Sequence, residues 1–427
     1  MKIERVLVEP VRSGFYRDDQ AAIRAGAVRD GFLYEGGVLT PGFSAIREPG
    51  VAVSVMLVLS DGQVALGDCV EVQYPGAGGR SPVFTAEAAL AELREHVVPA
   101  LTGRTVAGFR ELAEEIDAYE VDGQPLLTAV RYGVTQAILH ATALANAVTM
   151  AEVIQQEYQT GLAIGSVPIY AQTGDERRVN ADKMILKEVD VLPHGLINEV
   201  DGKLGRDGSL LKDYVAWLRT RILEVRSRAD YFPRLHIDSY GTIGIAFDGD
   251  IGRIADYLGE LAGLAAPFRL RVEHPVDAGD RDAQIEAFVS LRRTLAERSI
   301  DIELVVDEWC NTREDIELFV AAGAADVIHV KMPDLGGINN TIEALLHVRS
   351  HGLAAYCGGS CNETDVSARI STHIAMACGA DQVLAKPGMG VDEGLMITGN
   401  EMARTLALVG ARTQPALVES LAAGSQG

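Results

Sequence analysis

The chain is poor in cysteine, and the few it has are not arranged for cross-linking. Its 427 residues include five cysteines, and no two of them form a Cys-x-x-Cys pair. An odd number of cysteines without paired spacing is typical of reduced thiols in an intracellular protein. The composition therefore argues against a small secreted protein held together by disulfides.

Long apolar runs are also missing. No apolar stretch approaches the roughly 20 residues that a membrane-spanning helix needs. The N-terminal sequence MKIERVLVEPVRSGF carries charges and a proline where a signal peptide has its apolar core. We therefore expect a cytoplasmic protein with no membrane partner.

Positive charge and proline are scarce as well. Lys and Arg number 38 against 60 Asp and Glu, so the formal net charge is −22. Nucleic-acid binding needs a basic surface, so this balance disfavours a nucleic-acid partner, and any anionic ligand must find positive charge within its own site. With 15 prolines and a hydrophobic fraction of 48%, the chain is not disordered. Its length suits a barrel with a second domain.

Three carboxylates recur at an even spacing. Asp238, Glu273 and Asp307 lie 35 and 34 residues apart, each at the end of a short apolar run: RLHID, RLRVE and ELVVD. Such runs predict buried strands, and the spacing fits one strand, one helix and two loops per repeat. A parallel barrel would gather the three side chains at its C-terminal rim. Any one of them could simply cap a helix, but together they would repel each other unless a cation held them, and all-oxygen ligands favour Mg²⁺, Mn²⁺ or Ca²⁺.

The chain divides into two predicted domains. Residues 1–160 indicate an α+β capping domain with a hairpin, 51–59 and 63–70 around Ser60-Asp61-Gly62, followed by helices at 85–101, 106–119 and 126–147. Residues 161–427 alternate strands and helices, which predicts a TIM-type (β/α)8 barrel. The eight strands are predicted at 167–171, 184–187, 235–238, 268–273, 304–307, 327–331, 354–358 and 382–386.

Two candidate bases accompany the carboxylates. In Val327-Ile328-His329-Val330-Lys331, alternation places His329 and Lys331 on one face of a strand, inside the barrel if Ile328 and Val330 face the helices. A lysine beside a metal and carboxylates can act as a base, although an ion pair with Asp307 or Glu308 is the alternative. His194, predicted in a Leu-Pro-His-Gly loop, is a second acid–base candidate.

Neutral polar groups lie near the predicted strand ends. Gln172, Ser360 and Cys361 could hydrogen-bond substrate carboxylates, although they could equally be ordinary loop residues. The glycine-rich segment 75–80 lacks the Gly-Lys-Ser/Thr ending of a phosphate loop. We interpret it as a mobile lid with Gln73 and Tyr74 at its edge.

The chain resembles the methylaspartate ammonia-lyase family of the enolase superfamily, which uses a Lys or His base with Mg²⁺. The resemblance runs from residue 15 almost to the C-terminus. It is carried by the stretches FYRDDQ, DKMILK, VLPH, HIDSYGT, DEWCNT, PDLGG, GGSCNET and AKPGMG.

The resemblance implies elimination of ammonia from 3-methylaspartate to give mesaconate, with Mg²⁺, commonly K⁺, and a homodimer. Asp238, Glu273 and Asp307 would bind Mg²⁺ and a metal-stabilised enolate would form. Lys331 would take the C3 proton of the (2S,3S) substrate and His194 that of the (2S,3R) epimer. The substrate would be held by the residues Gln73, Tyr170, Gln172, His329, Tyr356, Ser360, Cys361 and Leu384.

Three positions depart from the family pattern. His329 stands where a glutamine is usual, His274 where a glycine follows the metal ligand, and Ser360 where a threonine is usual. A protonated His329 would grip a carboxylate more strongly than glutamine, so substrate preference could shift. The alternatives are another superfamily reaction, a dehydratase or racemase on a different carboxylate, and a non-catalytic binding protein on this scaffold.

Overall fold

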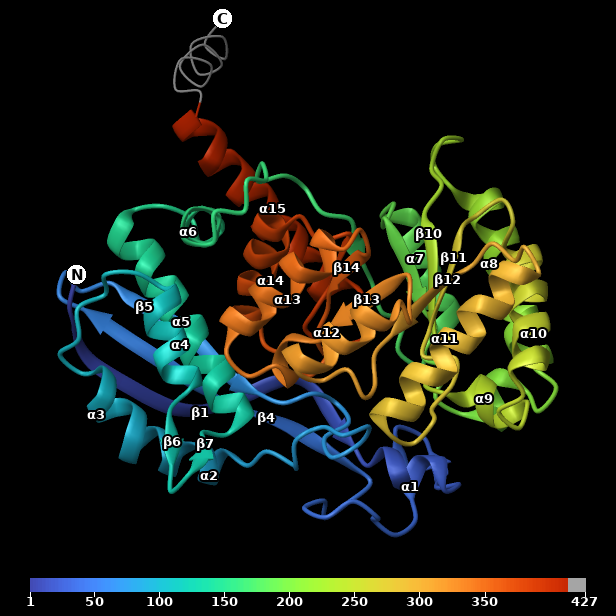
Figure 1. The fold of residues 1–427 in the computed structure, drawn as a ribbon, viewed down its shortest axis with the longest axis horizontal. Coiled ribbons are helices and arrows are strands. Elements are labelled where there is room, and N and C mark those ends of the chain that lie inside the picture. The colour runs from blue at the N-terminus through green and yellow to red at the C-terminus, as the bar shows by residue number, and fades with distance from the viewer. Residues whose placement is uncertain (414–427) are drawn as a thin grey trace, which may run out of the picture.

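A closed barrel of parallel strands forms the centre of the computed structural model, which describes residues 1–413 (Figure 1). Around the barrel the strands follow the order β10-β11-β12-β13-β14-β15-β8-β9. Their bounds are Ile169–Tyr170, Val191–His194, Arg234–Asp238, Leu270–Glu273, Glu303–Val306, Val327–Val330, Ala354–Cys357 and Gln382–Leu384 for β8 to β15. The predicted (β/α)8 barrel is confirmed.

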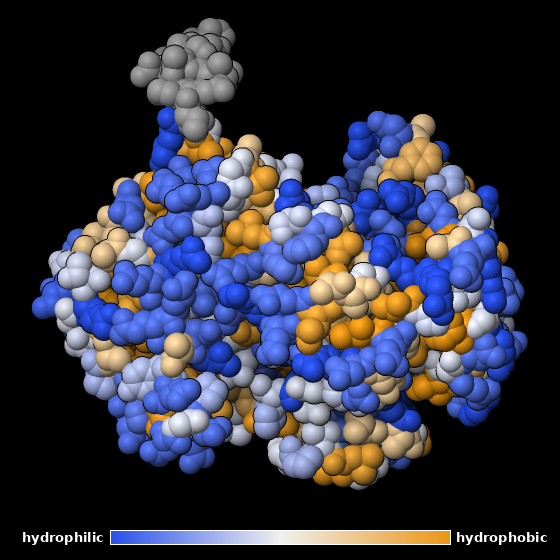
Figure 2. Space-filling view, in the orientation of Figure 1, coloured by the Kyte–Doolittle hydropathy of each residue, from blue (hydrophilic) through white to orange (hydrophobic). Residues whose placement is uncertain are grey.

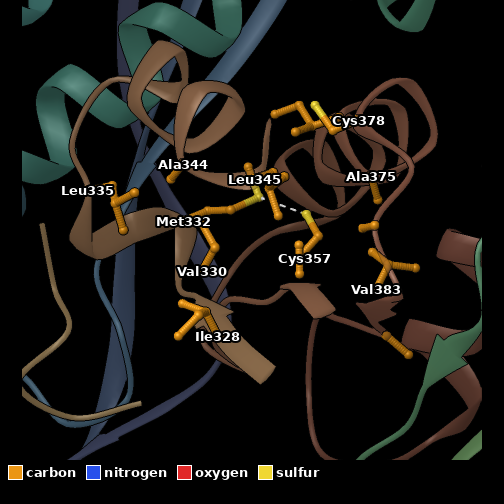
Figure 3. Packing of buried hydrophobic residues seen from close by; sticks show 14 of the residues in the cluster. Ile328, Val330, Met332, Leu335, Ala344, Leu345, Cys357, Ala375, Cys378 and Val383 are labelled. Atoms are coloured by element: carbon orange, nitrogen blue, oxygen red, sulfur yellow. Dashed lines mark hydrogen bonds between the residues drawn. The ribbon is translucent and has the colours of Figure 1, made fainter. Parts of the chain in front are cut away.

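The barrel strands are buried on both faces, and alternation sorts their side chains. Ile328 and Val330 of β13 point outward into an apolar cluster with Met332 and Cys357, between β13, β14 and the helices behind them (Figure 3). His329, between them, therefore faces the interior, as predicted. The helices that follow the strands are α7 (Arg177–Leu186), α8 (Ser209–Val225), α9 (Thr242–Ala246), α10 (Ile251–Ala265), α11 (Arg281–Glu297), α12 (Arg313–Ala322), α13 (Ile338–Ser350), α14 (Asp365–Cys378) and α15 (Asp392–Thr413), with short turns η2 (Val200–Leu204) and η3 (Met332–Asp334).

The N-terminal residues form an antiparallel sheet beside the barrel (Figure 1). It has the order β1-β4-β5, with bounds Ile3–Asp18, Arg47–Leu59 and Val64–Val70, so the predicted hairpin is confirmed. Helix α5 (Thr128–Asn146) packs closely on β5, because Gly67 and Gly133 have no side chains. A Cβ at either glycine would overlap the backbone of the other element. The remaining elements here are α1 (Gln20–Arg24), β2 (Val28–Asp30), β3 (Leu33–Glu35), α2 (Ala86–Glu92), η1 (Leu93–Val97), α3 (Val98–Leu101), α4 (Arg110–Asp117), β6 (Glu120–Val121), β7 (Gln124–Pro125) and α6 (Met150–Glu157).

One predicted strand is wrong. Residues 184–187 form the end of α7 and its C-cap, where Met184 and Ile185 are buried on one face of a helix. The second barrel strand is instead β9, Val191–His194. Pro193 cannot donate a hydrogen bond, but its carbonyl accepts one from the Thr173 N–H, so the proline is compatible with the strand. His194 therefore ends a barrel strand rather than lying in a loop.

The surface is largely hydrophilic on the face that Figure 2 shows, in keeping with the acidic composition. Among the described residues, no single helix is long and apolar enough to cross a membrane. The bent pair α5 and α6, with 94° between its halves, meets the length and composition criteria only when the two are taken together.

Candidate active site

Three buried carboxylates meet at the C-terminal rim of the barrel. Asp238 and Glu273 are the last residues of β10 and β11 and are register partners, and Asp307 directly follows β12. They are 3%, 1% and 2% exposed. The barrel thus brings together the evenly spaced carboxylates of the sequence, in surroundings where their charge is poorly solvated.

Glu273 is held between two histidines. Its Oε2 lies 2.8 Å from His236 Nε2, and its Oε1 lies 2.6 Å from His329 Nδ1. Hydrogen bonds on the far side of each ring fix the tautomers. Gln382 Nε2 donates to His236 Nδ1, and the Gly359 N–H donates to His329 Nε2, so both rings present an N–H to Glu273.

The orientation of the Gln382 amide is itself determined. Arg271 Nη1 donates to Gln382 Oε1 at 2.8 Å, which leaves Nε2 to face His236. A relay from Arg271 through Gln382 and His236 therefore ends on Glu273. Carboxylates that are hydrogen-bonded in this way keep a fixed orientation, as metal ligands require.

The carboxylates differ in acidity. Burial raises the pKa of Glu273 to about 8, and the Asp238 and Asp307 charges add to this, although His329 opposes it. The pKa of Asp307 is lowered, because Lys331, His329 and Arg80 outweigh the effect of its burial. A carboxylate that burial and its neighbours keep from ionising fits a site built for a cation.

His329 lies within this cluster. Donor atoms of Glu273, Asp307 and His329 lie within 4.8 Å of one another, a spacing at which they could share a metal ion. The Nδ1–H of the fixed tautomer nevertheless points at Glu273 and gives no lone pair to a metal. Burial lowers the pKa of His329, against the Asp307 and Glu273 charges, so the imidazole is neutral rather than the protonated group considered from the sequence.

Lys331 follows β13 and points to the same rim. Its Nζ lies 2.6 Å from Asp307 Oδ2, so the ion pair considered from the sequence is present. Burial and Arg80 lower the pKa of Lys331, but the Asp307, Glu308 and Asp334 carboxylates raise it further, and the net direction is upward. In this arrangement Lys331 carries its proton.

Arg80 is the residue that the sequence did not reveal. It ends the glycine-rich segment 75–80 and reaches Asp307 at 3.1 Å, Glu308 at 3.5 Å and Asp334 at 2.9 Å. Its side chain is only 1% exposed. The segment contributes a cation to the carboxylate cluster, and nothing in its sequence indicated which group that arginine would meet.

His194 faces the rim from the other side. Strands β9 and β13 are four places apart in the ring of eight, so His194 and Lys331 lie on opposite sides of the barrel. His194 Nε2 lies 3.5 Å from Asp238 Oδ2 and 3.4 Å from the Tyr240 hydroxyl, and the Leu196 N–H donates to Nδ1 at 3.3 Å. The neutral ring therefore carries its proton on Nε2, toward the cavity.

These groups enclose a cavity with a free volume of about 30 Å³. Most of the predicted site residues line it: Gln73, Gln172, His194, Asp238, Glu273, His329, Lys331, Tyr356, Ser360, Cys361 and Leu384. Tyr74, Arg80 and Tyr240 line it as well. Asp307 does not line the cavity but contacts Arg80 and Lys331, which do. Tyr170 does not line the cavity, because its ring stacks on His236, 4.3 Å between centroids, inside the barrel below the rim.

Residues 358–361, which follow β14, close one wall of the cavity. Ser360 Oγ accepts the Gln73 N–H at 2.9 Å, and Cys361 Sγ donates to Gln73 Oε1 at 3.2 Å. Gln73 Nε2 donates to Asp18, which is paired with Arg47. In the sequence, Gln73 is far from Ser360 and Cys361. In the fold they contact one another where the N-terminal residues meet the barrel.

Two family models together match almost the whole chain. The model described as "Methylaspartate ammonia-lyase N-terminus" matches residues 1–159, and "Methylaspartate ammonia-lyase C-terminus" matches residues 161–411. The methylaspartate ammonia-lyase of Clostridium tetanomorphum is 55% identical over 412 residues, which cover 96% of this chain and 100% of that protein. That of Citrobacter amalonaticus is 49% identical over 409 residues, covering 96% and 99%.

Solved structures give the same result. The C. tetanomorphum enzyme in an Mg complex matches with a TM-score of 0.91, covering 96% of this chain and 100% of that one. The C. amalonaticus enzyme containing (2S,3S)-3-methylaspartic acid matches with a TM-score of 0.93 at 49% identity and the same coverage. Muconate lactonizing enzyme from Pseudomonas putida, 16% identical with a TM-score of 0.58 over 88% of this chain and 85% of its own, shares the fold. The chain belongs to the methylaspartate ammonia-lyase family.

Proposed function

We propose that this protein is an Mg²⁺-dependent ammonia-lyase that converts 3-methylaspartate to mesaconate and ammonia, or a close 3-substituted aspartate to ammonia and the fumarate with the same substituent. The observation that carries the proposal is the placement of Lys331 and His194 on opposite sides of one rim that also holds three buried carboxylates. Relatives named for this activity, about half identical over nearly the whole chain, support the same reaction.

Asp238, Glu273 and Asp307 would hold the metal. Their all-oxygen donor set suits Mg²⁺, and the raised pKa of Glu273 reflects negative charge that a cation would relieve. When bound, Mg²⁺ supplies positive charge to the substrate carboxylate next to the carbon that loses its proton. A relative's structure in an Mg complex supports this choice of ion.

Lys331 is the proposed base for the (2S,3S) substrate. It removes the C3 proton, the C2–C3 double bond forms, and the C2–N bond breaks so that its electron pair leaves with nitrogen as NH₃. Mg²⁺ bound to Asp307 would offset the carboxylate charge that most raises the pKa of Lys331. Burial and Arg80, which lower that pKa, would then favour the neutral amine.

His194 is the proposed base for the (2S,3R) epimer, because it lies across the barrel from Lys331. To accept a proton at Nε2 it must carry its own proton on Nδ1, so its contact with the Leu196 N–H has to give way. This requirement predicts slower turnover of the (2S,3R) epimer than of the (2S,3S) epimer.

The substrate carboxylates would bind to neutral donors. Gln172 Nε2 has no hydrogen-bond partner among the described residues, so a buried donor is free for one carboxylate. Cys361 would serve the same carboxylate, and Ser360 and His329 the other. Gln73, Tyr356 and Leu384 would surround the amino and methyl groups.

A lyase assay on a panel of 3-substituted aspartates tests the proposal. We expect a conjugated, ultraviolet-absorbing product from 3-methylaspartate, formed only with Mg²⁺ and accompanied by stoichiometric ammonia. A metal-dependent reaction of another carboxylate, with no ammonia from any aspartate, would favour a dehydratase or racemase instead. The homodimer and K⁺ activation belong to the same proposal. Light scattering checks the dimer, and replacing KCl by tetramethylammonium chloride checks the activation.

A further inference from the structure

A fully buried ion pair contacts residues 358–361, which we name the substrate loop because the proposed function places the substrate against them. The pair has no part in the chemistry above. Lys386, two residues after β15, and Glu363, six residues after β14, both have side chains that are 0% exposed, with Nζ 2.7 Å from Oε2. Lys386 Nζ also lies 3.9 Å from Met332 Sδ, at the edge of the apolar cluster of Figure 3. A charge pair in such surroundings gains little for stability over apolar residues of the same size, which points to another role.

The pair fixes the backbone of the substrate loop at both ends. Glu363 Oε2 accepts the Ser360 N–H at 2.8 Å, and Lys386 Nζ donates to the Gly358 carbonyl at 3.2 Å. Gly359 lies between them, and a Cβ there would overlap both the carboxylate and the ammonium. The loop therefore has one position relative to the pair.

A tyrosine from the N-terminal residues completes the arrangement. The Tyr132 hydroxyl, on α5, donates to Glu363 Oε1 at 2.5 Å. Burial, together with the Glu363 charge, raises the pKa of Tyr132 well above its ordinary value, so the hydroxyl keeps its proton and remains a donor. Both carboxylate oxygens of Glu363 are thus occupied, one from the barrel and one from α5.

Three groups that face the cavity depend on the loop. Ser360 Oγ and Cys361 Sγ contact Gln73, and the Gly359 N–H sets the tautomer of His329. A shift of the loop would move these groups together. Asp238 and Asp307, on other strands, would keep their places, and Glu273 would keep its hydrogen bond to His236.

We propose that Lys386, Glu363 and Tyr132 are positioning residues for the substrate-carboxylate pocket. They hold residues 358–361 where Ser360 and Cys361 meet the substrate. The inference rests on the proposed function, because it is that function which gives the loop a substrate to bind. The inference concerns substrate affinity. Proton transfer is assigned to Lys331 and His194, which lie at the ends of other strands.

The double variant Glu363→Gln/Lys386→Met separates positioning from stability. Each single change leaves one unpaired buried charge, so the singles lose thermal stability, while the double removes both charges and regains most of the melting temperature. For the double we expect KM to rise by about tenfold or more, kcat at saturating Mg²⁺ to stay within about threefold, and the Kd for Mg²⁺ to change by a smaller factor than KM. Tyr132→Phe, which removes one hydrogen bond, should raise KM by a smaller factor.

Hydrogen–deuterium exchange gives a readout that does not need turnover. The amides of residues 358–363 should exchange faster in the double variant than in the wild type. The control is Lys212→Met/Glu260→Gln, which removes a Lys–Glu pair of the same type on the barrel surface, 31% and 60% exposed, and should change neither KM nor this exchange.

A folded double variant with wild-type KM and wild-type exchange across the loop would overturn the inference. Faster exchange with unchanged KM would also overturn it, because the loop would then be held but not for the substrate. If the wild type releases no ammonia from any aspartate, the proposed function fails. In that case unchanged exchange still refutes the positioning role, and faster exchange with a weakened Kd for unreacted 3-methylaspartate supports it.

Discussion

At the scale of single residues, Glu273 determines how the rim responds to pH. It is buried between two imidazole N–H donors, and its pKa of about 8 is far above the ordinary value. Below pH 8 the carboxyl group is protonated before a metal arrives. A cation must therefore displace a proton, and metal binding and proton release are linked at this residue.

We predict that Mg²⁺ affinity falls as pH is lowered through 8. Each unit below 8 should weaken the Kd by about tenfold, with Glu273 releasing about one proton per ion at pH 7 and almost none at pH 9.5. Titration calorimetry in two buffers of different ionisation enthalpy measures the released protons. Without metal the sign is opposite: the raised pKa stabilises the fold at low pH, and this contribution is lost as pH rises through 8.

A Kd for Mg²⁺ that is the same at pH 7 and pH 9.5, with no proton release at either, would contradict this reading of Glu273. Glu273→Gln is the matched variant, since it keeps the shape of the side chain and cannot release a proton.

Many residues of the site could be predicted from patterns in the sequence. Even spacing predicted Asp238, Glu273 and Asp307, and strand alternation placed His329 inside the barrel. The same alternation would have found His236, two residues before Asp238 on the same face of β10. The donors that fix the tautomers could not be predicted, because Gly359 and Gln382 reach the two rings only after the barrel has closed.

At the scale of elements, the segment 75–80 and strand β9 each place one side chain at the site, Arg80 and His194. The segment brings Arg80 onto Asp307, Glu308 and Asp334, and with it in place the cavity has a free volume of only about 30 Å³. A dicarboxylic amino acid is larger than this volume, so we expect part of the wall to move when it binds. The lid role of the segment stays a prediction, and Arg80 is the contact that would have to break.

Arg80→Ala should weaken binding of the methylaspartate substrate, with an increase in KM of about tenfold or more. It removes the one cation of the segment and leaves the carboxylates of Asp307, Glu308 and Asp334 without this partner close to the site of a dicarboxylate substrate. Arg80→Lys keeps the charge but loses the forked contacts of the guanidinium group. Its KM should lie between those of the wild type and the alanine variant. Steady-state kinetics at saturating Mg²⁺ measure the effect, and an alanine variant with wild-type KM would show that Arg80 is not needed for binding.

The error in the second strand has a clear physical cause. Met184 to Leu186 is a short apolar run, and periodicity alone does not separate a buried helix end from a buried strand. Pro193 favoured a loop at 192–195, because proline lacks the N–H that a strand residue can donate. In the structure only its carbonyl takes part in the hydrogen bonding, as the acceptor of the Thr173 N–H, and the sequence does not show this. The consequence is functional, since a strand end holds His194 more rigidly than a loop would.

At the scale of the whole molecule, the N-terminal sheet and the barrel share the site. Gln73 contacts Ser360, Tyr132 contacts Glu363, and Arg80 contacts Asp307, all buried. Neither part has a complete cavity without the other. We therefore expect the two parts to unfold together.

Denaturant unfolding tests this expectation. Trp217 lies on barrel helix α8, whereas Trp309 follows β12 and contacts Gly78 of the N-terminal part. Fluorescence of a Trp309→Phe variant therefore reports on the barrel, while far-ultraviolet circular dichroism reports on the whole chain. The two midpoints should coincide. A circular-dichroism transition with a separate step at a denaturant concentration where fluorescence does not change would show that the N-terminal residues unfold independently.

The most direct test of the account compares Lys331→Ala and His194→Ala on the two epimers of 3-methylaspartate at saturating Mg²⁺. If Lys331 and His194 act from opposite sides of the rim, Lys331→Ala abolishes ammonia release from the (2S,3S) epimer. His194→Ala should then reduce turnover of the (2S,3R) epimer more than that of the (2S,3S) epimer. Equal losses on both epimers in both variants would contradict a two-sided site, and full activity of Lys331→Ala on the (2S,3S) epimer would remove Lys331 as the base.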